Sequence, residues 1–171
     1  PDVLLRAIAV LLKRDPSLRS RLVVPVVGGP SGTGLAHPES LAMLADELGL
    51  LDVVRFVPPV DQRALADWYA AATLVAVPSY NESFGLEAAE ALAAGTPVVA
   101  ASVGGLKTVV RDGVSGLLVD THDPSDWADA LGRVISDPSL QRSLTAGALD
   151  QASRFAWERT AAETLQTYER A

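Results

Sequence analysis

The chain has 171 residues, of which 49% are hydrophobic and 20% charged, a composition that supports a substantial core and excludes a disordered segment. Its formal net charge of -7 excludes a broad nucleic-acid-binding face, because such a face needs an excess of lysine and arginine. The chain contains no cysteine, which excludes a disulfide framework, a thiolate metal site and a cysteine nucleophile.

Helical and strand-like patterns alternate along the whole chain. In chain order we predict a helix over 2–14, a strand over 21–27, a loop over 28–38, a helix over 39–48, a strand over 53–57, a helix over 62–72, a strand over 73–77, a helix over 83–94, a strand over 97–101, a short helix over 105–111, a strand over 116–119 and helices over 125–136, 138–153 and 157–170. This alternation predicts an α/β domain with a doubly wound, Rossmann-like parallel sheet. Ligands of such domains bind at the carboxyl ends of the strands, so the loops after Val27, Val57, Val77 and Ala101 are expected to line a site.

The first residues already belong to a helical pattern. Pro1 suits the first turn of a helix and no methionine precedes it, so we expect the chain to be part of a longer protein. No signal peptide and no apolar run long enough to span a bilayer is present, which favours a soluble protein. The lack of cysteine fits a cytoplasmic location.

The segment 78–90 carries the strongest functional signal. Ser83 is a suitable N-cap for the helix that follows. The N–H groups of Phe84, Gly85 and Leu86 would then lack intrahelical partners and would form an anion site, supported by the helix dipole. Gly85 would also let a ligand approach the backbone closely.

Two glutamates, Glu82 and Glu90, frame this segment. Helical rise would separate them by roughly 12 Å or less along the axis, which is too far for the carboxylate pair of a retaining glycosidase, about 5 Å apart. The span suits the two ends of one extended ligand, because a carboxylate can accept hydrogen bonds from a vicinal diol. Glu90 lies among alanines, where an acid needs a partner. The alternative interpretation is that both are ordinary solvated helix residues.

A second glycine-rich segment, 28–35, has the glycine spacing of a P-loop. Leu35 stands where that motif requires lysine, so we exclude a nucleoside triphosphatase. Pro38 prevents a helix from opening directly after the loop, which argues against a dinucleotide-binding fingerprint. Gly28 and Gly29 are left either as ligand contacts or as a tight turn over the sheet edge.

The remaining candidates carry weaker signals. Gly104 and Gly105 open a short helix and form either a phosphate contact or a plain turn. His37 and His122 are the only histidines, and neither stands in a metal-ligand spacing. We expect His122 to pack or cap locally.

These segments together resemble the family 4 retaining glycosyltransferases. The stretch from Glu82 to Glu90 matches the E-x7-E signature of that family. The other matching stretches are Val75–Ser79, Ala91–Pro97, Val103–Gly105, Asp112–Gly113 and Gly116–Val119. The resemblance covers essentially the whole chain. It implies that residues 1–171 form the C-terminal, nucleotide-sugar-binding domain of a two-domain GT-B enzyme, with the helix in 154–171 packing toward the N-terminal domain.

Some segments give a closer match within the family, namely Val27–Leu35, Val54–Pro59, Asn81–Leu86, and His122 with Trp127–Ala128. They resemble the members that transfer N-acetylglucosamine from UDP-N-acetylglucosamine to 1L-myo-inositol 1-phosphate, with retention, in mycothiol biosynthesis. Two alternatives stay open: another hexosyl- or mannosyltransferase of the family, and a non-catalytic nucleotide-sugar-binding module. A nucleotide-sugar epimerase shares the architecture, but E-x7-E favours the transferase.

The resemblance also implies roles for individual residues of 82–90. Glu82 would contact the hydroxyls of the donor sugar and is the expected catalytic residue. Ser83 and the backbone amides of Phe84, Gly85 and Leu86 would contact the sugar and the diphosphate. Glu90 would bind the ribose diol.

Other donor contacts are implied outside that segment. The uracil would lie near Val60 and be held through the backbone, because valine stands where the family can carry arginine. Gly28 and Gly29 would complete the donor contacts. No cofactor is required, since the UDP-sugar is a substrate. The resemblance implies a structural magnesium ion held by backbone oxygens near four residues, Tyr69, Ala70, Ala72 and Thr96.

The family's remaining parts would lie upstream of Pro1. They are an arginine and a lysine that bind phosphate, a central strand of the sheet, and the N-terminal domain that holds the inositol phosphate acceptor. We therefore expect these 171 residues alone to be inactive and poorly folded. The full-length protein is expected to be a homodimer.

Overall fold

The computed structural model describes residues 1–28 and 39–170. Its elements, in chain order, are α1 (Asp2–Arg14), η1 (Pro16–Ser20), β1 (Val24–Val27), α2 (Glu39–Glu47), β2 (Val54–Val57), α3 (Gln62–Ala71), β3 (Val75–Val77), α4 (Leu86–Ala93), β4 (Val98–Ala101), α5 (Leu106–Val109), β5 (Gly116–Val119), α6 (Pro124–Ser136), α7 (Pro138–Ala152), η2 (Ser153–Phe155) and α8 (Trp157–Glu169). The order of helices and strands is the predicted one, with the short 3-10 helices η1 and η2 in addition.

Every strand pairing is parallel, which confirms the predicted α/β class. β1 pairs with β2 from Val24 opposite Val54, β3 pairs with β4 from Val75 opposite Val98, and β4 pairs with β5. In the described part of the chain the strands form two sheets, β1–β2 and β3–β4–β5, instead of one continuous sheet. The free edges of β1 and β3 are therefore the place where the doubly wound sheet is interrupted.

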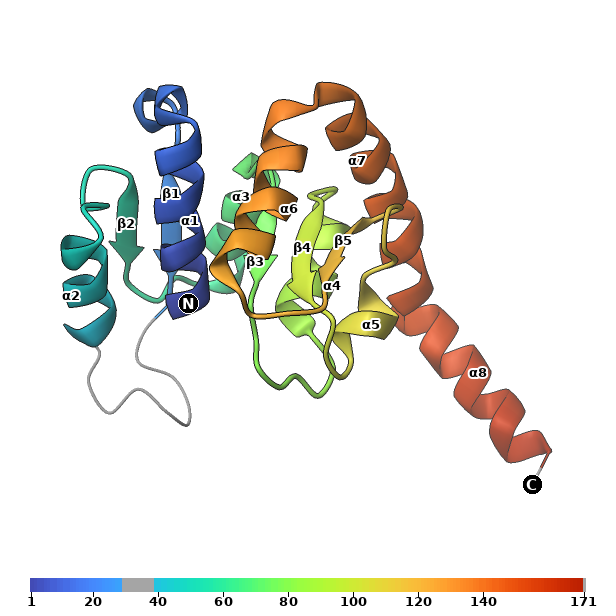
Figure 1. The fold of residues 1–171 in the computed structure, drawn as a ribbon. Helices are drawn as coiled ribbons and strands as arrows, with labels where there is room; N and C mark the ends of the chain where they lie inside the picture. The colour runs from blue at the N-terminus through green and yellow to red at the C-terminus, as the bar shows by residue number, and fades with distance from the viewer. Residues whose placement is uncertain (29–38, 171) are drawn as a thin grey trace.

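Helices cover both faces of the strands. Figure 1 shows α1 and α6 side by side in front of the strands, with α3 and α4 behind them. α1 packs along α6, and Leu11 of α1 lies directly over Gly132 of α6. This contact joins the helix that precedes β1 to the helix that follows β5, so it holds the two sheets together.

The core is concentrated around β4. All four residues of β4 are fully buried, as are Leu106 of α5, Trp127 of α6 and Leu144 of α7. The Trp127 indole donates to the backbone oxygen of Thr121 at 2.9 Å, which satisfies its one polar group. A strand buried on both faces needs an unbroken apolar sequence, and Val98–Ala101 has one.

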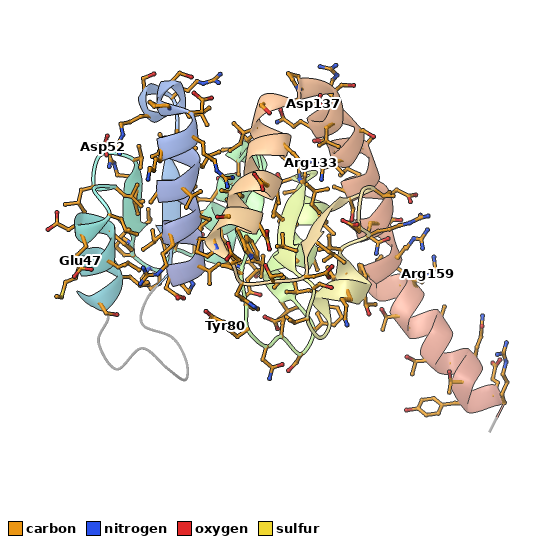
Figure 2. The ribbon with its side chains drawn as sticks, viewed as in Figure 1. Glu47, Asp52, Tyr80, Arg133, Asp137 and Arg159 are labelled. Atoms are coloured by element: carbon orange, nitrogen blue, oxygen red, sulfur yellow. The ribbon has the colours of Figure 1, made fainter. Side chains whose placement is uncertain are left out.

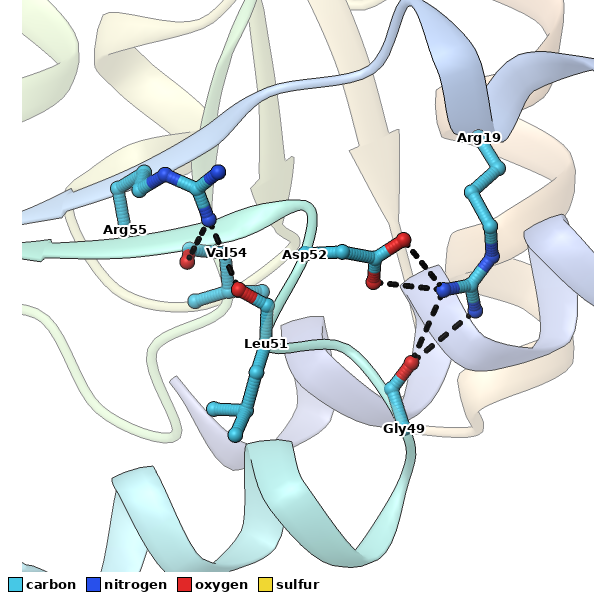
Figure 3. A network of polar contacts seen from close by, with 6 residues as sticks. All are labelled: Arg19, Gly49, Leu51, Asp52, Val54 and Arg55. Carbon is cyan, nitrogen blue, oxygen red and sulfur yellow. Dashed lines mark hydrogen bonds and ion pairs between the residues drawn. The ribbon is translucent and has the colours of Figure 1, made fainter.

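A polar network braces the β1–β2 half at the amino ends of its strands. Arg19 of η1 binds the carboxylate of Asp52 and the backbone oxygen of Gly49, and Arg55 donates to the backbone oxygens of Leu51 and Val54 (Figure 3). The network fixes η1 to the turn that enters β2.

The last helix, α8, extends away from the body of the domain (Figure 1). Leu165 and Tyr168 on it are 62% and 74% exposed. Across residues 1–28 and 39–170, the helices are all too short or too polar to traverse a lipid bilayer.

Candidate functional site

The loops at the carboxyl ends of β3, β4 and β5 converge on one rim of the domain. The Gly105 N–H, after β4, donates to the backbone oxygen of Glu82, after β3, at 3.0 Å. His122, after β5, lies 3.0 Å from the backbone oxygen of Ser79 through Nε2 and stacks on Tyr80, with ring centroids 4.2 Å apart. Figure 2 shows Tyr80 at the end of the molecule opposite Asp52 and Asp137. Of the four loops predicted to line the site, those after Val77 and Ala101 are thus in contact, and the loop after β5, which carries His122, was not among the four.

The helix that follows β3 begins later than predicted. α4 starts at Leu86, and its N-cap is Gly85 in the left-handed conformation, with φ 95°; Ser83 is not the cap. The first bond of the helix runs from the Ala89 N–H to the Gly85 oxygen at 3.0 Å. The amides that precede this bond therefore extend to Glu87 and Ala88, beyond the three that were predicted. The correction has a conformational cause, because glycine adopts a positive φ that ends the extended loop and starts the helix.

Glu82 consequently lies in a loop, and helical rise does not set its distance from Glu90. Its backbone is held from behind by the turn at Gly104 and Gly105. A Cβ on Gly104 would lie 1.8 Å from the Glu82 oxygen, and a Cβ on Gly105 would lie 2.5 Å from the Phe84 Cα. Both glycines are thus required for close packing of one loop on another, and the Gly105 amide is engaged by Glu82. The phosphate contact considered for Gly105 is replaced by this supporting role.

Glu90 has the partner that its apolar setting requires. Its Oε2 atom accepts a hydrogen bond from the Tyr69 hydroxyl of α3 at 3.3 Å. Burial, the charges of Glu90 and Glu87 and the hydrogen bond itself raise the pKa of the Tyr69 phenol well above its usual value. Tyr69 therefore stays protonated and remains a donor to Glu90. No local sequence pattern indicates this side-chain pair, because only packing of α3 on α4 joins positions 21 residues apart.

The rim also exposes apolar side chains. Tyr80, Phe84 and Leu86 are 65%, 45% and 63% exposed, and the Phe84 ring meets Phe155 of η2 edge-on at 6.0 Å between centroids. Exposed apolar groups gathered beside acids are typical of a surface that binds a ligand or a neighbouring domain. Phe155 was not singled out from the sequence.

Two of the remaining residues predicted to bind the donor sugar nucleotide, Gly28 and Val60, lie near β1 and β2. Gly28 follows β1 with φ 136°, and its N–H donates to the Val57 oxygen at 3.0 Å, so this amide extends the β1–β2 pairing. Val60 is half-buried in the loop between β2 and α3, where Asp61 caps α3 through the Ala64 N–H. Gly29 lies outside the described residues. Ser83 is exposed in the loop that carries Glu82.

The predicted cation ligands gather at the end of α3 and the turn before β4. The Tyr69 oxygen accepts the Ala72 N–H at 3.1 Å and the hydroxyl of the buried Thr96 at 2.7 Å. A carbonyl oxygen has two lone pairs, so this acceptor is satisfied within the chain. Of the residues that the structure describes, no three acidic or histidine side chains gather as a metal site. The arrangement does not favour a cation on the Tyr69 oxygen, and the magnesium ion stays a prediction.

Two shallow hollows lie away from the rim. One is on α7, lined by Pro138, Gln141, Arg142, Thr145 and Ala146, and the other is on α3, lined by Ala64, Asp67, Trp68 and Ala71. Trp68, which lines the hollow on α3, is 38% exposed. Each hollow is formed by residues of one helix only. Glu82 and Glu90 line neither hollow.

The parallel α/β architecture, with acids and open amides at the carboxyl ends of its strands, agrees with the family comparisons. Residues 1–151 match the family described as "Glycosyl transferases group 1", and the chain belongs to this family. Its fold is that of the GT-B glycosyltransferases.

The relatives give a narrower similarity. The chain is 71% identical over 177 aligned residues to the D-inositol 3-phosphate glycosyltransferase of Nocardioides sp. strain JS614, covering 100% of this chain and 39% of the relative. It is 61% identical over 168 residues to the D-inositol 3-phosphate glycosyltransferase of Streptomyces griseus, covering 98% of this chain and 36% of the relative. The chain thus spans about two fifths of the length of these relatives.

Solved structures agree with the fold. Sucrose-phosphate synthase from Thermosynechococcus elongatus matches 98% of this chain and 42% of its own, with a TM-score of 0.83 and 35% identity. HepE from Anabaena, solved in complex with UDP-glucose, matches 96% of this chain and 44% of its own, with a TM-score of 0.81 and 27% identity.

Proposed function

We propose that this chain is the C-terminal donor-binding domain of a retaining glycosyltransferase. The full-length enzyme would transfer N-acetylglucosamine from UDP-N-acetylglucosamine to 1L-myo-inositol 1-phosphate. The observation that carries the proposal is the segment from β3 into α4, where Glu82 lies in a braced loop, α4 opens at Leu86 and Glu90 follows one turn later. The names of the relatives support the inositol phosphate acceptor, and the UDP-glucose bound in the Anabaena structure supports a nucleotide-sugar donor.

The residues of this segment divide the donor between them. The Glu82 carboxylate accepts hydrogen bonds from the hydroxyls of the donor sugar. The amides from Phe84 to Ala88 face the diphosphate at the positive end of the α4 dipole. The Glu90 carboxylate accepts from the ribose diol, and the uracil lies near Val60. Preorganised N–H donors stabilise the charge that develops on the departing diphosphate.

Retention would require the acceptor to attack on the face that the diphosphate leaves, without a covalent intermediate on a residue of this segment. The bond from the anomeric carbon to the diphosphate oxygen breaks while the acceptor hydroxyl oxygen bonds to that carbon on the same face. The acceptor proton passes to the departing phosphate oxygen, so UDP leaves with the bonding electron pair. Residues 78–90 contain three glutamates and no lysine or arginine. The positive charge that a diphosphate needs would come from an arginine and a lysine outside this chain.

The rest of the full-length protein would complete both the sheet and the site. A strand inserted between the free edges of β1 and β3 would join the two sheets into the single doubly wound sheet. A separate N-terminal domain would hold the inositol phosphate, and the exposed face of α8 would pack toward it. This chain alone would then be inactive and poorly folded. A homodimer and a cytoplasmic location complete the proposal.

The first experiment measures turnover of the full-length enzyme with UDP-N-acetylglucosamine, offering 1L-myo-inositol 1-phosphate or unphosphorylated inositol. We expect turnover with the phosphate, and an α-linked product would establish retention. Turnover only with another acceptor or another donor sugar would assign a different transferase of the family. Tight UDP binding without any transfer would instead indicate a non-catalytic module.

The second experiment tests the site through Glu82→Gln. A hydrogen bond to a charged group contributes about 1.5–3 kcal/mol, so kcat/KM should fall about 10–100-fold. Glu47→Gln, at an exposed position of α2, is the matched control and should leave kcat/KM unchanged. Equal activity of both variants would contradict the role of Glu82.

A further inference from the structure

Tyr69 is held at both of its ends by residues of the α4 region. Its backbone oxygen accepts the hydroxyl of Thr96 at 2.7 Å, and its side-chain hydroxyl donates to Glu90 Oε2 at 3.3 Å. Thr96 is 3% exposed, so its hydroxyl has little access to water and depends on Tyr69. The tyrosine is therefore fixed in place before any ligand arrives.

The hydrogen bond from Tyr69 occupies only one part of the Glu90 carboxylate. An ionised carboxylate offers two oxygens and about four acceptor positions, and the tyrosine uses one of them on Oε2. Within residues 1–28 and 39–170 the Glu90 carboxylate accepts no other hydrogen bond, so Oε1 and the second lone pair of Oε2 can accept from hydroxyl groups of a ligand. Fixing one oxygen removes rotational freedom from a flexible glutamate, which would otherwise lose it on binding.

We propose that Tyr69 is a positioning residue that aims the Glu90 carboxylate at the two hydroxyls of the donor ribose. The inference rests on the proposed role of Glu90 and deepens it, because it makes Tyr69 a determinant of selectivity for ribonucleotides. A phenol suits this task, because its hydroxyl donates a single hydrogen bond to the carboxylate at 3.3 Å.

Two hydrogen bonds of Tyr69 allow its positioning role to be distinguished from a purely structural role. The bond of Thr96 to the Tyr69 backbone already fixes α3 on the turn before β4, and phenylalanine at position 69 would keep it. The phenol hydroxyl reaches Glu90 alone among the hydrogen-bond partners that the structure gives it. Loss of the hydroxyl should therefore change recognition of the ribose diol and leave the packing of α3 in place.

The test compares UDP with 2′,3′-dideoxy-UDP, which lacks both ribose hydroxyls, by calorimetric titration of the full-length protein. The readout is the dissociation constant of 2′,3′-dideoxy-UDP divided by that of UDP, which measures the preference for a ribose that carries both hydroxyls. In Tyr69→Phe this ratio should fall about five-fold, the equivalent of one hydrogen bond. Glu90→Gln should lower it about ten-fold or more. Tyr168→Phe removes a tyrosine hydroxyl from α8, which lies outside the α3–α4 contact, so it is the matched control and should leave the ratio unchanged.

The outcomes distinguish the two proposals. If Glu90→Gln leaves the ratio unchanged, the ribose role of Glu90 is wrong and the inference about Tyr69 falls with it. If Glu90→Gln lowers the ratio but Tyr69→Phe weakens both ligands equally, only the positioning role is overturned.

The double variant, with Tyr69→Phe and Glu90→Gln together, adds an independent check. Without the Glu90 carboxylate, loss of the Tyr69 hydroxyl should have no further effect on the ratio. An equal effect of Tyr69→Phe in both backgrounds would also overturn the inference. Thermal unfolding of each variant, followed by circular dichroism, identifies any variant that has lost its fold. If Tyr69→Phe has lost it, the comparison is repeated with Tyr69→His, which restores a donor at that position and should recover part of the ratio.

Discussion

The two sheets of the domain are built by the same parallel pairing but differ in how well they are buried. In the β3–β4–β5 half, every residue of β4 is inaccessible to solvent. In the β1–β2 half, Pro25, Arg55 and Phe56 are exposed within the strands themselves. The loop that carries Glu82 and the helix that carries Glu90 belong to the better-buried half. The proposed donor site is thus placed on the better-buried of the two sheets, which suits a site that needs fixed positions for its polar groups.

The largest expected effect comes from Gly104→Ala in the loop behind Glu82. The new Cβ would lie 1.8 Å from the Glu82 oxygen at a φ of 45°, so conformational strain and a backbone clash add. We expect a loss of roughly 2–5 kcal/mol of stability, together with loss of UDP binding. Thermal unfolding of the full-length protein measures the loss of stability, and titration with UDP measures the loss of binding.

Gly113→Ala is the matched control for this substitution. It has a φ of 68° but no atom within 4 Å of the new Cβ, so only strain of about 1–2 kcal/mol applies. Equal losses in the two variants would show that close packing behind Glu82 is unimportant.

The next effect tests whether the two halves behave as one body. Leu11→Ala removes the side chain by which α1 packs on Gly132 of α6, and a buried leucine truncated to alanine typically costs about 2–5 kcal/mol. Hydrogen exchange should show the amides of β1 and β2 losing protection before those of β4. Met43→Ala, at a position 62% exposed, should change stability by less than about 0.5 kcal/mol. Simultaneous loss of protection in both halves would mean that they are more tightly coupled than their burial indicates.

A smaller effect is expected from His122, which supports the Ser79–Tyr80 part of the site loop from β5. A carbonyl oxygen only accepts hydrogen bonds, so Nε2 carries the proton toward Ser79. His122→Ala loses this bond and the stack on Tyr80, and UDP affinity should fall about five-fold. His122→Phe keeps the stack alone and should give an intermediate value. Unchanged UDP affinity in both variants would show that the contacts of His122 with Ser79 and Tyr80 do not contribute to donor binding.

The smallest effect lies in the β1–β2 half, at the exposed pair of Arg19 and Asp52. The hydrogen bond from Arg19 lowers the pKa of the Asp52 carboxyl below its ordinary value. A carboxyl whose pKa is lower in the folded state stabilises the fold above its unfolded pKa, and this contribution disappears as the pH falls through the folded pKa. The stability difference between the wild type and Asp52→Asn should therefore shrink on acidification. It should also shrink in high salt, which screens exposed charges. A difference independent of pH would indicate that packing, and not charge, accounts for the effect of Asp52.

The sequence by itself determined the features that depend on neighbouring residues. Periodicity predicted the order of helices and strands because side chains three or four positions apart share a helix face and alternate positions share a strand face. The E-x7-E spacing pointed to the correct family. An acid among alanines indicated that Glu90 needs a partner, although it could not say which residue supplies it.

Only the tertiary structure decided which distant residues meet. No local pattern encodes the contacts of Glu90 with Tyr69, of Glu82 with Gly105 and of Ser79 with His122, because each joins two segments that are distant in the sequence. The start of α4 also moved for this reason. Because Gly105 fixes the Glu82 backbone, Gly85 makes the turn into the helix that the local preference of Ser83 for an N-cap would have made earlier. Local propensity is worth about 1 kcal/mol per residue, and close packing between loops exceeds it.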